Sequence, residues 1–376
     1  MKLSRKKLGR TGLEISSLGL GGFHQCEVDS DTVKSVFDEF LRLGGNYVET
    51  ARSYGRGSSE YKIGRAINGV RDQLIVGSKT ACRDAEDVWR ELNETLDALQ
   101  TDHLDLYFMH NIFTGEDLEK TISPGGALEA FIKAKEQKLI KHIAMSTHWP
   151  IILLDAMEKI PVEAILIWGN YLDYCNYPEI PDVILPAMRE RGIGHLIMKP
   201  LADGFLYKSV EPAFRFALRE NPDCIVSGFN SVEMLKQDAE AVSLGPLNEA
   251  ATDELLFGAT ELGDYVCRQC KKCSVMPDDQ GILLKKLFEL EGKFDRQMND
   301  YKPVDAGTYA LRQRLGKWFG NHDRAAGEFM RLSGEFMTAF MSCLEGEDCP
   351  CRYGINIPRK IRIATEKLSN GHPEAI

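Results

Sequence analysis

The sequence predicts a closed α/β barrel of eight parallel strands, followed by a small, mostly helical, cysteine-rich module. Three observations lead to this prediction. Short apolar runs alternate with longer segments of helical periodicity from about residue 15 to residue 245. Eight such runs are present, as many as a (β/α)8 (TIM) barrel contains. Beyond residue 248 the alternation stops, and six of the ten cysteines are crowded into the remaining chain.

The apolar runs have the length and composition of buried strands, and the segments between them have the spacing of amphipathic helices. Because strands that alternate with helices form parallel sheets, this order favours a barrel with its chemistry past the C-terminal ends of the strands. The alternative, an open doubly wound sheet, would carry a Gly-x-Gly-x-x-Gly turn after an early strand, and we find none. The predicted strands are 17–20, 47–49, 74–77, 104–109, 142–145, 164–167, 194–198 and 224–227, and the predicted helices include 32–43, 86–99, 128–137, 183–191 and 212–220.

Composition and charge narrow the classes of partner. The chain has 376 residues, of which 43% are hydrophobic, which suffices for one large core and a second, smaller one. A net charge of −10 and an isoelectric point of about 5.4 argue against nucleic acid or an anionic membrane as a partner. The sequence has no apolar run of the roughly eighteen residues a membrane span needs and no signal core after its basic start, so we expect a cytoplasmic protein.

The segment Leu-Gly-Pro-Leu-Asn at 244–248 marks a change of architecture. Beyond it, two cysteine-rich stretches flank a mostly helical region. We therefore assign residues 1–250 to the barrel and residues 251–376 to a separate C-terminal module. Apolar residues at 282–288 and 329–341 have helical spacing, and we expect them to pack this module.

Four titratable side chains lie at or just past the ends of the second, third and fourth predicted strands: Glu49, Tyr54, Lys79 and His110. A phenol is a poor acid near neutral pH unless a nearby cation favours its anion. Lys79 can supply that cation, and Glu49 can hold it in place. His110 can hydrogen-bond a substrate oxygen and orient it. These residue types predict proton transfer to a carbonyl oxygen.

The segments around these side chains resemble motifs of the aldo/keto reductase family. Segment 46–67, which ends in Gly-Ser-Ser-Glu-Tyr-Lys-Ile-Gly-Arg-Ala-Ile, is similar to the most specific signature of the family. Segments 101–110, 141–148 and 198–206 are similar to three further motifs in the same order. The resemblance covers roughly the first 240 residues.

This resemblance implies an NAD(P)-dependent oxidoreductase that reduces a small aldehyde or ketone, or oxidises the alcohol. Tyr54 would be the general acid, with Lys79 and Glu49 tuning it and His110 orienting the substrate. An extended nicotinamide cofactor would lie across the mouth of the barrel. The resemblance assigns it to Gly21, Gly22, Phe23, Ser146, Asn170, Lys199, Pro200, Leu201, Gly228, Ser231, Gln237 and Asp238.

The sequence departs from the family pattern at three places. Glu49 stands where the family has Asp, and a misplacement of about 1 Å can cost on the order of 10²-fold in rate. Leu166 stands where the family has the Gln that holds the nicotinamide amide. The loop after the eighth strand lacks the Arg that faces a 2′-phosphate; Lys236 can substitute for it, so NADP(H) and NAD(H) both stay open. The first two departures favour a competing hypothesis, a catalytically weakened barrel that acts as a redox sensor or electron-transfer adaptor.

Two cysteine clusters in the tail predict an iron–sulfur centre. Cys267, Cys270 and Cys273 form a C-x2-C-x2-C run, which suits a 4Fe–4S cubane better than a zinc site, since zinc sites tend to pair two C-x2-C knuckles. In ferredoxin-type runs the fourth ligand comes from the other run, here Cys351, with Cys349 as the alternative. A structural zinc site stays open at this point, as does the choice between one cluster and two.

The tail resembles the ferredoxin-type extension found in some aldo/keto reductases of bacteria and archaea. That resemblance implies a metal-binding module that carries a 4Fe–4S cluster and leaves room for an electron-transfer partner. A nicotinamide moves two electrons as hydride whereas a cubane moves one, and no flavin motif is visible to couple them. A structural and a redox-active cluster are therefore both consistent with the sequence.

Overall fold

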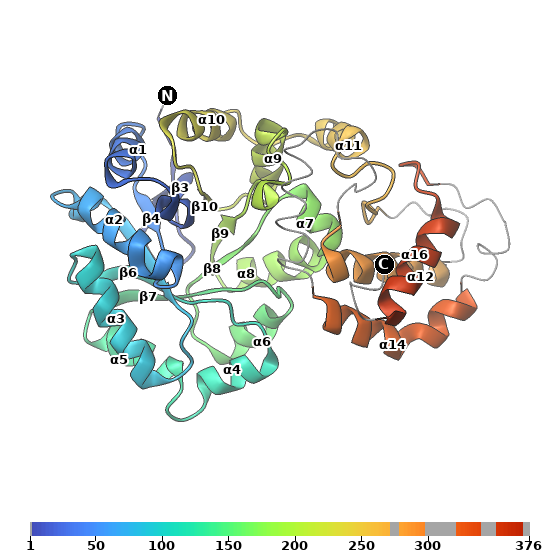
Figure 1. Cartoon of the computed structure of the whole chain (residues 1–376), viewed down its shortest axis with the longest axis horizontal. Coiled ribbons are helices and arrows are strands. Elements are labelled where there is room, and N and C mark those ends of the chain that lie inside the picture. The colour runs from blue at the N-terminus through green and yellow to red at the C-terminus, as the bar shows by residue number, and fades with distance from the viewer. Residues whose placement is uncertain (1, 271–277, 298–320, 340–350, 371–376) are drawn as a thin grey trace. The chain divides into compact units, whose positions relative to one another are not determined.

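The computed structural model describes residues 2–270, 278–297, 321–339 and 351–370 (Figure 1). Its contacts divide the chain into two compact units. The first comprises Met1–Gly169, Glu179–Pro200 and Ser209–Leu247, and the second comprises Asn170–Pro178, Leu201–Lys208 and Asn248–Ile376. The final division after Leu247 lies near the expected one after residue 250. Two short segments that we had assigned to the barrel domain belong to the second unit instead.

Eight parallel strands close into a barrel in the first unit, as predicted (Figure 1). The last strand, β10, pairs with both β9 and β3, which excludes the open sheet. The third strand was expected to end at residue 77 but runs on to Thr80, because polar residues of its C-terminal half are buried and paired with β6. The strands are β3 (Leu18–Gly21), β4 (Tyr47–Glu49), β5 (Ile75–Thr80), β6 (Leu104–Met109), β7 (Ile140–Ser146), β8 (Ala164–Trp168), β9 (Gly194–Met198) and β10 (Cys224–Ser227).

Helices connect the strands and surround them (Figure 1). In α1, Asp29 caps the N-terminus by accepting a hydrogen bond from the Thr32 amide at 2.8 Å, and Val33, Phe37 and Phe40 are buried on one face. The helix expected at 183–191 begins as a π-helical turn, Ile180–Ile184, and continues as α8. The helices of this unit are α1 (Ser30–Arg42), α2 (Ser58–Ile67), α3 (Ala85–Leu99), α4 (Gly115–Ile122), α5 (Ala127–Glu136), α6 (Ile152–Lys159), α8 (Leu185–Glu190), α9 (Val210–Ala217) and α10 (Val232–Ser243).

An N-terminal hairpin that the sequence analysis missed closes the barrel at the N-terminal ends of its strands. Its strands, β1 (Arg5–Lys7) and β2 (Glu14–Ser16), are antiparallel and too short to show alternation. Leu8 and Ile15 are fully buried and belong to the apolar cluster that fills the barrel interior. Because this end is filled, chemistry is left to the opposite end.

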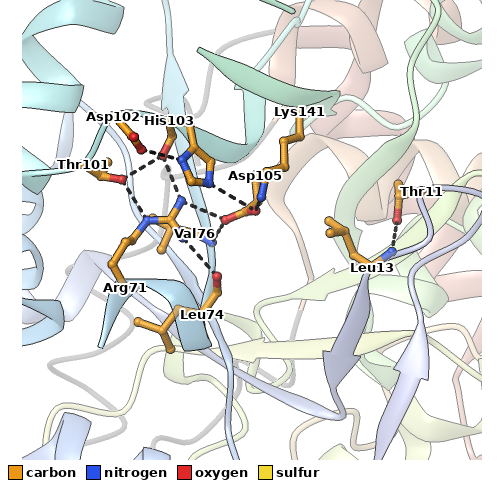
Figure 2. Close-up of polar contacts among 10 residues, drawn as sticks. All are labelled: Thr11, Leu13, Arg71, Leu74, Val76, Thr101, Asp102, His103, Asp105 and Lys141. Carbon is orange, nitrogen blue, oxygen red and sulfur yellow. Dashed lines mark hydrogen bonds and ion pairs between the residues drawn. The ribbon is translucent and has the colours of Figure 1, made fainter. Parts of the chain in front are cut away.

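A polar cluster joins the N-terminal ends of β5, β6 and β7 (Figure 2). Asp105 of β6 accepts hydrogen bonds from the Val76 amide of β5 and from Arg71, both at 2.9 Å, and from Lys141 of β7 at 2.8 Å. Arg71 also donates to the His103 carbonyl oxygen at 2.8 Å. Asp105 is only 2% exposed, so this paired carboxylate fastens three neighbouring strands together.

The described residues of the second unit are mostly helical, as expected of the C-terminal module. Leu284, Leu287, Phe288 and Phe329 pack in its apolar core, whereas Ile282, which we had placed there, is 68% exposed. Among the described residues, none of the helices has the length and apolar character of a membrane span. The helices of its described residues are α7 (Tyr171–Asn176), α11 (Glu249–Gly258), α12 (Asp278–Asp295), α14 (His322–Ala339) and α16 (Ile357–Asn370), with a 3-10 turn at Ala202–Gly204.

Candidate active site

The first unit brings together the four predicted catalytic side chains. Glu49 is the last residue of β4, Lys79 lies in β5, and His110 directly follows β6. Tyr54 opens the turn that follows β4. Since β4, β5 and β6 are neighbours in the barrel, their C-terminal ends deliver all four side chains to one place.

Lys79 lies at the centre of these contacts. Its ammonium group pairs with the Glu49 carboxylate and donates hydrogen bonds to the Tyr54 hydroxyl oxygen at 3.2 Å and to the Thr50 carbonyl oxygen at 2.8 Å. The rings of Tyr54 and His110 meet edge to face, with centroids 5.8 Å apart. Lys79 is 1% and Glu49 5% exposed, so water screens their attraction less than it would at the surface.

The surroundings shift the ionisation of two of these groups. Burial lowers the pKa of Lys79 well below its ordinary value, while the Glu49 carboxylate beside it favours the charged ammonium. Burial, together with the charge of Lys79, lowers the pKa of His110 to about 3. His110 is therefore a neutral imidazole at neutral pH and can donate one hydrogen bond through its protonated ring nitrogen.

Two arginines that the sequence analysis did not single out hold the loops of this site. Arg52 pairs with the buried Glu60 at 2.7 Å. Arg83 donates to the carbonyl oxygens of His110 and Asn111, at 3.0 and 2.9 Å, and so fixes the loop after β6. Arg52 and its partner Glu60 both lie within the signature segment 46–67 and could have been found there. Arg83 gave no local signal, because its partners are 27 and 28 residues away.

The turn after β3 carries three predicted cofactor contacts. Gly21 ends the strand, and Gly22 and Phe23 follow it. A side chain at Gly22 would bring its Cβ to 2.7 Å from the Glu49 carbonyl oxygen, so only glycine fits this approach of backbones. Phe23 is 43% exposed, and its ring meets the Tyr54 ring edge to face with centroids 5.2 Å apart.

Predicted contacts for the phosphate end follow β9 and β10. Lys199 and Pro200 come directly after β9, and Lys199 has a left-handed backbone with φ of 55°. Gly228 comes directly after β10. Ser231 caps the N-terminus of α10 by accepting a hydrogen bond from the Met234 amide at 3.2 Å. The N-terminus of a helix carries partial positive charge, which suits a phosphate group.

The remaining predicted contacts on α10 are Gln237 and Asp238. Asp238 is only 5% exposed and accepts a hydrogen bond from the Ser227 hydroxyl at 2.6 Å. Burial raises the pKa of Asp238 to about 7, and the hydrogen bond from Ser227 opposes that rise. Lys236, the expected substitute for a phosphate-binding Arg, is 59% exposed and lies 3.9 Å from Glu39.

Ser146 ends β7 in the first unit, and its hydroxyl accepts a hydrogen bond from the Asn111 amide at 3.3 Å. Two predicted contacts, Asn170 and Leu201, belong to the second unit. Asn170 caps α7: its side-chain oxygen accepts from the Asp173 amide at 2.8 Å, and its side-chain amide donates to the Asp173 carboxylate at 2.5 Å.

The family model described as Aldo/keto reductase family matches residues 17–245, which include all eight strands of the barrel. The chain belongs to this family. The uncharacterised oxidoreductase YqkF of Bacillus subtilis is 28% identical to it over 216 residues, which cover 54% of this chain and 67% of that protein. L-galactose dehydrogenase of Arabidopsis thaliana is 28% identical over 237 residues, 58% of this chain and 72% of that protein.

Solved structures show the same barrel. The holo form of aldo-keto reductase AKR11C1 from Bacillus halodurans superposes with a TM-score of 0.59 at 22% identity, covering 68% of this chain and 95% of that one. The thermostable aldo-keto reductase Tm1743, in complex with the inhibitor epalrestat, gives a TM-score of 0.56 at 24% identity, covering 67% and 98%.

As a member of the aldo/keto reductase family, the protein is an NAD(P)-dependent oxidoreductase. Glu49 and Leu166, the first two departures from the family pattern, differ in their consequences. Glu49 pairs with Lys79 despite its extra methylene. Leu166 is 2% exposed within the apolar interior of the barrel, where it offers no polar atom.

The cysteine-bearing tail lies beyond the segment that the aldo/keto reductase model matches. Cys267, Cys270 and Cys351 are each partly buried, and Cys267 and Cys351 pack against the same apolar cluster. Cys273 and Cys349 lie outside the described residues. Within the described ranges, no three His, Cys, Asp or Glu side chains are grouped so as to hold a metal ion.

Proposed function

We propose that the protein transfers a hydride between a nicotinamide cofactor and a small aldehyde or ketone, or the corresponding alcohol in the reverse direction. The observation that carries this proposal is the contact of the Tyr54 hydroxyl with the buried pair of Lys79 and Glu49. In carbonyl reduction, negative charge develops on the carbonyl oxygen and must be met by a proton.

Tyr54 gives its hydroxyl proton to that oxygen. The phenolate that remains keeps the hydrogen bond from the Lys79 ammonium, whose charge stabilises it. Glu49 in turn stabilises the buried ammonium. His110, neutral because its pKa is lowered to about 3, donates a hydrogen bond to the substrate oxygen without competing as the acid.

The cofactor, when bound, supplies or accepts the hydride. Support for its place comes from the glycine turn beside Glu49 and from the capped N-terminus of α10, which suits a phosphate. With Lys236 exposed and no Arg in that loop, the proposal covers both NADP(H) and NAD(H). It assigns the cofactor to Gly21, Gly22, Phe23, Ser146, Asn170, Lys199, Pro200, Leu201, Gly228, Ser231, Gln237 and Asp238.

Replacing Tyr54 with Phe tests the proposed general acid. We expect Tyr54→Phe to lower kcat by at least about 10²-fold, because the proton donor is lost, while nicotinamide affinity stays unchanged. Turnover would be measured with a panel of small aldehydes and ketones, and binding by NADH and NADPH titration. Tyr61→Phe is a matched control, since Tyr61 is 51% exposed on α2. Turnover retained in Tyr54→Phe would rule this mechanism out.

We also propose that the C-terminal module holds one 4Fe–4S cluster on Cys267, Cys270, Cys273 and Cys351, with Cys349 as the alternative fourth ligand. The C-x2-C-x2-C run and the shared apolar packing of Cys267 and Cys351 support this. Such a cluster suits a reducing, cytoplasmic setting and would exchange single electrons with a partner. Leu166 favours the second candidate function, a redox sensor or electron-transfer adaptor.

Metal analysis of anaerobically purified protein tests the cluster. We expect about four irons and four sulfides per chain, lost in Cys267→Ser and retained in Cys224→Ser, since Cys224 is buried in the barrel interior. Zinc in place of iron would contradict the cluster. Iron together with tight nicotinamide binding but no turnover on any carbonyl would favour the sensor or adaptor.

A further inference from the structure

One arginine of the second unit binds two carboxylates that lie far from it in the sequence. Arg296 follows α12, and its guanidinium binds both oxygens of Asp173, each at 2.6 Å. It also pairs with Asp203. The side chain of Arg296 is 4% exposed and that of Asp173 is fully buried. Because a planar guanidinium matches a carboxylate through two parallel hydrogen bonds, this pair fixes orientation as well as charge.

The two carboxylates lie on the segments that follow two consecutive barrel strands. Asp173 is in α7, after β8, and Asp203 is in the 3-10 turn after β9. Asp203 itself has a left-handed backbone with φ of 58°, a conformation that needs support from its surroundings. Arg296 therefore ties together two loops of the kind that carry chemistry in this fold.

Asp173 in turn restrains the side chain of Asn170. The Asn170 side chain makes two hydrogen bonds to Asp173, one with its amide and one with its carboxylate. One Asp173 oxygen receives both the Asn170 amide and an Arg296 nitrogen, at 2.5 and 2.6 Å. The rotamer of Asn170 thus depends on the position of a carboxylate that Arg296 holds.

The backbone of α12 meets α7 closely beside this pair. An added Cβ at Gly292 would lie 2.5 Å from the Asn176 side-chain oxygen. The Asn176 side-chain amide donates to the Gln297 carbonyl oxygen at 3.2 Å, and Asn321 donates to the Tyr177 hydroxyl at 2.7 Å. These contacts do not involve the Arg296 side chain.

We propose that Arg296 is a positioning residue for nicotinamide binding, acting through Asp173 on Asn170 and through Asp203 on the loop that begins at Leu201. This inference rests on the proposed function, because that function assigns Asn170 and Leu201 to the cofactor. Arg296 lies outside the segment that the family model matches.

The experiment compares nicotinamide binding and kinetics in the full-length protein and its Arg296→Met and Arg296→Lys variants. We expect Arg296→Met to raise the cofactor Kd and KM by about 10- to 100-fold, with a smaller fall in kcat. Arg296→Lys keeps the positive charge but cannot make the two parallel hydrogen bonds. Its cofactor Kd should therefore lie between those of the wild type and Arg296→Met. Amide hydrogen exchange at 170–178 and 201–208 should rise in Arg296→Met.

Lys360→Met is the matched control. Lys360 is 2% exposed in the same unit and pairs with Glu291 of α12 at 2.7 Å and with the Gln297 side chain at 3.2 Å. Its loss therefore strains the same region while the contacts of Arg296 with Asp173 and Asp203 stay in place. We expect its cofactor Kd to match that of the wild type. Should Arg296→Met fail to fold, Asp203→Asn removes one arm of the same contact and should raise the Kd in the same direction.

Three results would overturn the inference, and they are distinguishable. If the wild type binds nicotinamide and the Arg296 and Asp203 variants bind it equally well, Arg296 has no positioning role and the proposed function survives. If Lys360→Met weakens binding as much as Arg296→Met, the effect is one of general stability. A wild type that binds neither NADH nor NADPH removes the proposed function and this inference with it.

Discussion

Glu49 shows that the candidate active site accommodates one extra methylene group. A longer carboxylate could have been displaced from Lys79, yet the pair forms and Lys79 still reaches both Tyr54 and Thr50. The pair is buried, and breaking such a pair by removing one partner typically costs about 3–5 kcal/mol. We therefore regard the Asp-to-Glu departure as compatible with turnover, and Leu166 as the more consequential one.

Asp238 is the residue whose ionisation should most visibly change stability near neutral pH. Its folded pKa of about 7 lies above the ordinary value, so the folded state binds more protons and stability falls as the pH rises from about 4 to about 7. Asp238→Asn keeps the shape and removes this cost. We expect the variant to gain on the order of 2 kcal/mol at pH 8 and less at pH 5, measured by urea unfolding. An equal gain at both pH values would show that Asp238 does not titrate in this range.

At the scale of elements, the two ends of the barrel have different tasks. The N-terminal ends are tied by Asp105 and covered by the hairpin, and the C-terminal ends present the candidate catalytic side chains. Asp105 bridges three consecutive strands with a single carboxylate (Figure 2). Separation of the two tasks lets one end be rigid while the loops at the other end vary.

Asp105→Ala should destabilise the barrel without changing the chemistry. Arg71 would lose a buried partner, and the Val76 amide would lose its acceptor, so we expect a loss of about 3–5 kcal/mol in the free energy of unfolding. KM should be unchanged below the unfolding transition. Asp102→Ala is the control, because Asp102 is 94% exposed and should change nothing measurable. An altered KM in Asp105→Ala would mean that the two ends are coupled.

At the scale of the whole molecule, each unit has its own apolar core, and the smaller one is supplemented by buried charge. Glu291 of α12 is fully buried and receives Lys360 at 2.7 Å and Lys367 at 3.3 Å, both from α16. These cations hold the pKa of Glu291 below its ordinary value despite burial. Its contribution to stability is therefore present at neutral pH and lost in acid.

Acid should destabilise the protein through its two buried histidines, and protonation of Asp238 opposes part of that loss. Burial lowers the pKa of both His110 and His195 to about 3, so the unfolded state takes up protons below about pH 6.5 while the folded state does not. Each histidine can contribute up to about 1.4 kcal/mol per pH unit. We expect the free energy of unfolding to fall by a few kcal/mol between pH 6.5 and 4.5, measured in urea. His195→Gln should reduce the loss of stability by about 1.4 kcal/mol per pH unit, because Asp238 contributes equally in the wild type and the variant, and an unchanged slope would contradict this assignment.

The sequence by itself determined the barrel and the identity of the four candidate catalytic side chains that the structure brings together. Both depend on local signals: short apolar runs of strand length, helices of period 3.6, and polar residues just past strand ends. Four of the predicted strands, among them Tyr47–Glu49 and Leu104–Met109, have the same bounds in the structure. The sequence did not predict the extension of β5 to Thr80, because the residues of that extension are polar and only tertiary contacts bury them.

Only the tertiary structure decided which distant charges meet. Arg296 is 123 residues from Asp173 and 93 from Asp203, and Arg71 is 34 from Asp105. Such pairs leave no periodic pattern in the sequence. A buried charge is stabilised by the partner that the fold brings near it rather than by its sequence neighbours. The same holds for Leu8 and Ile15, whose two short strands carry too few residues to show a pattern, yet they close the barrel.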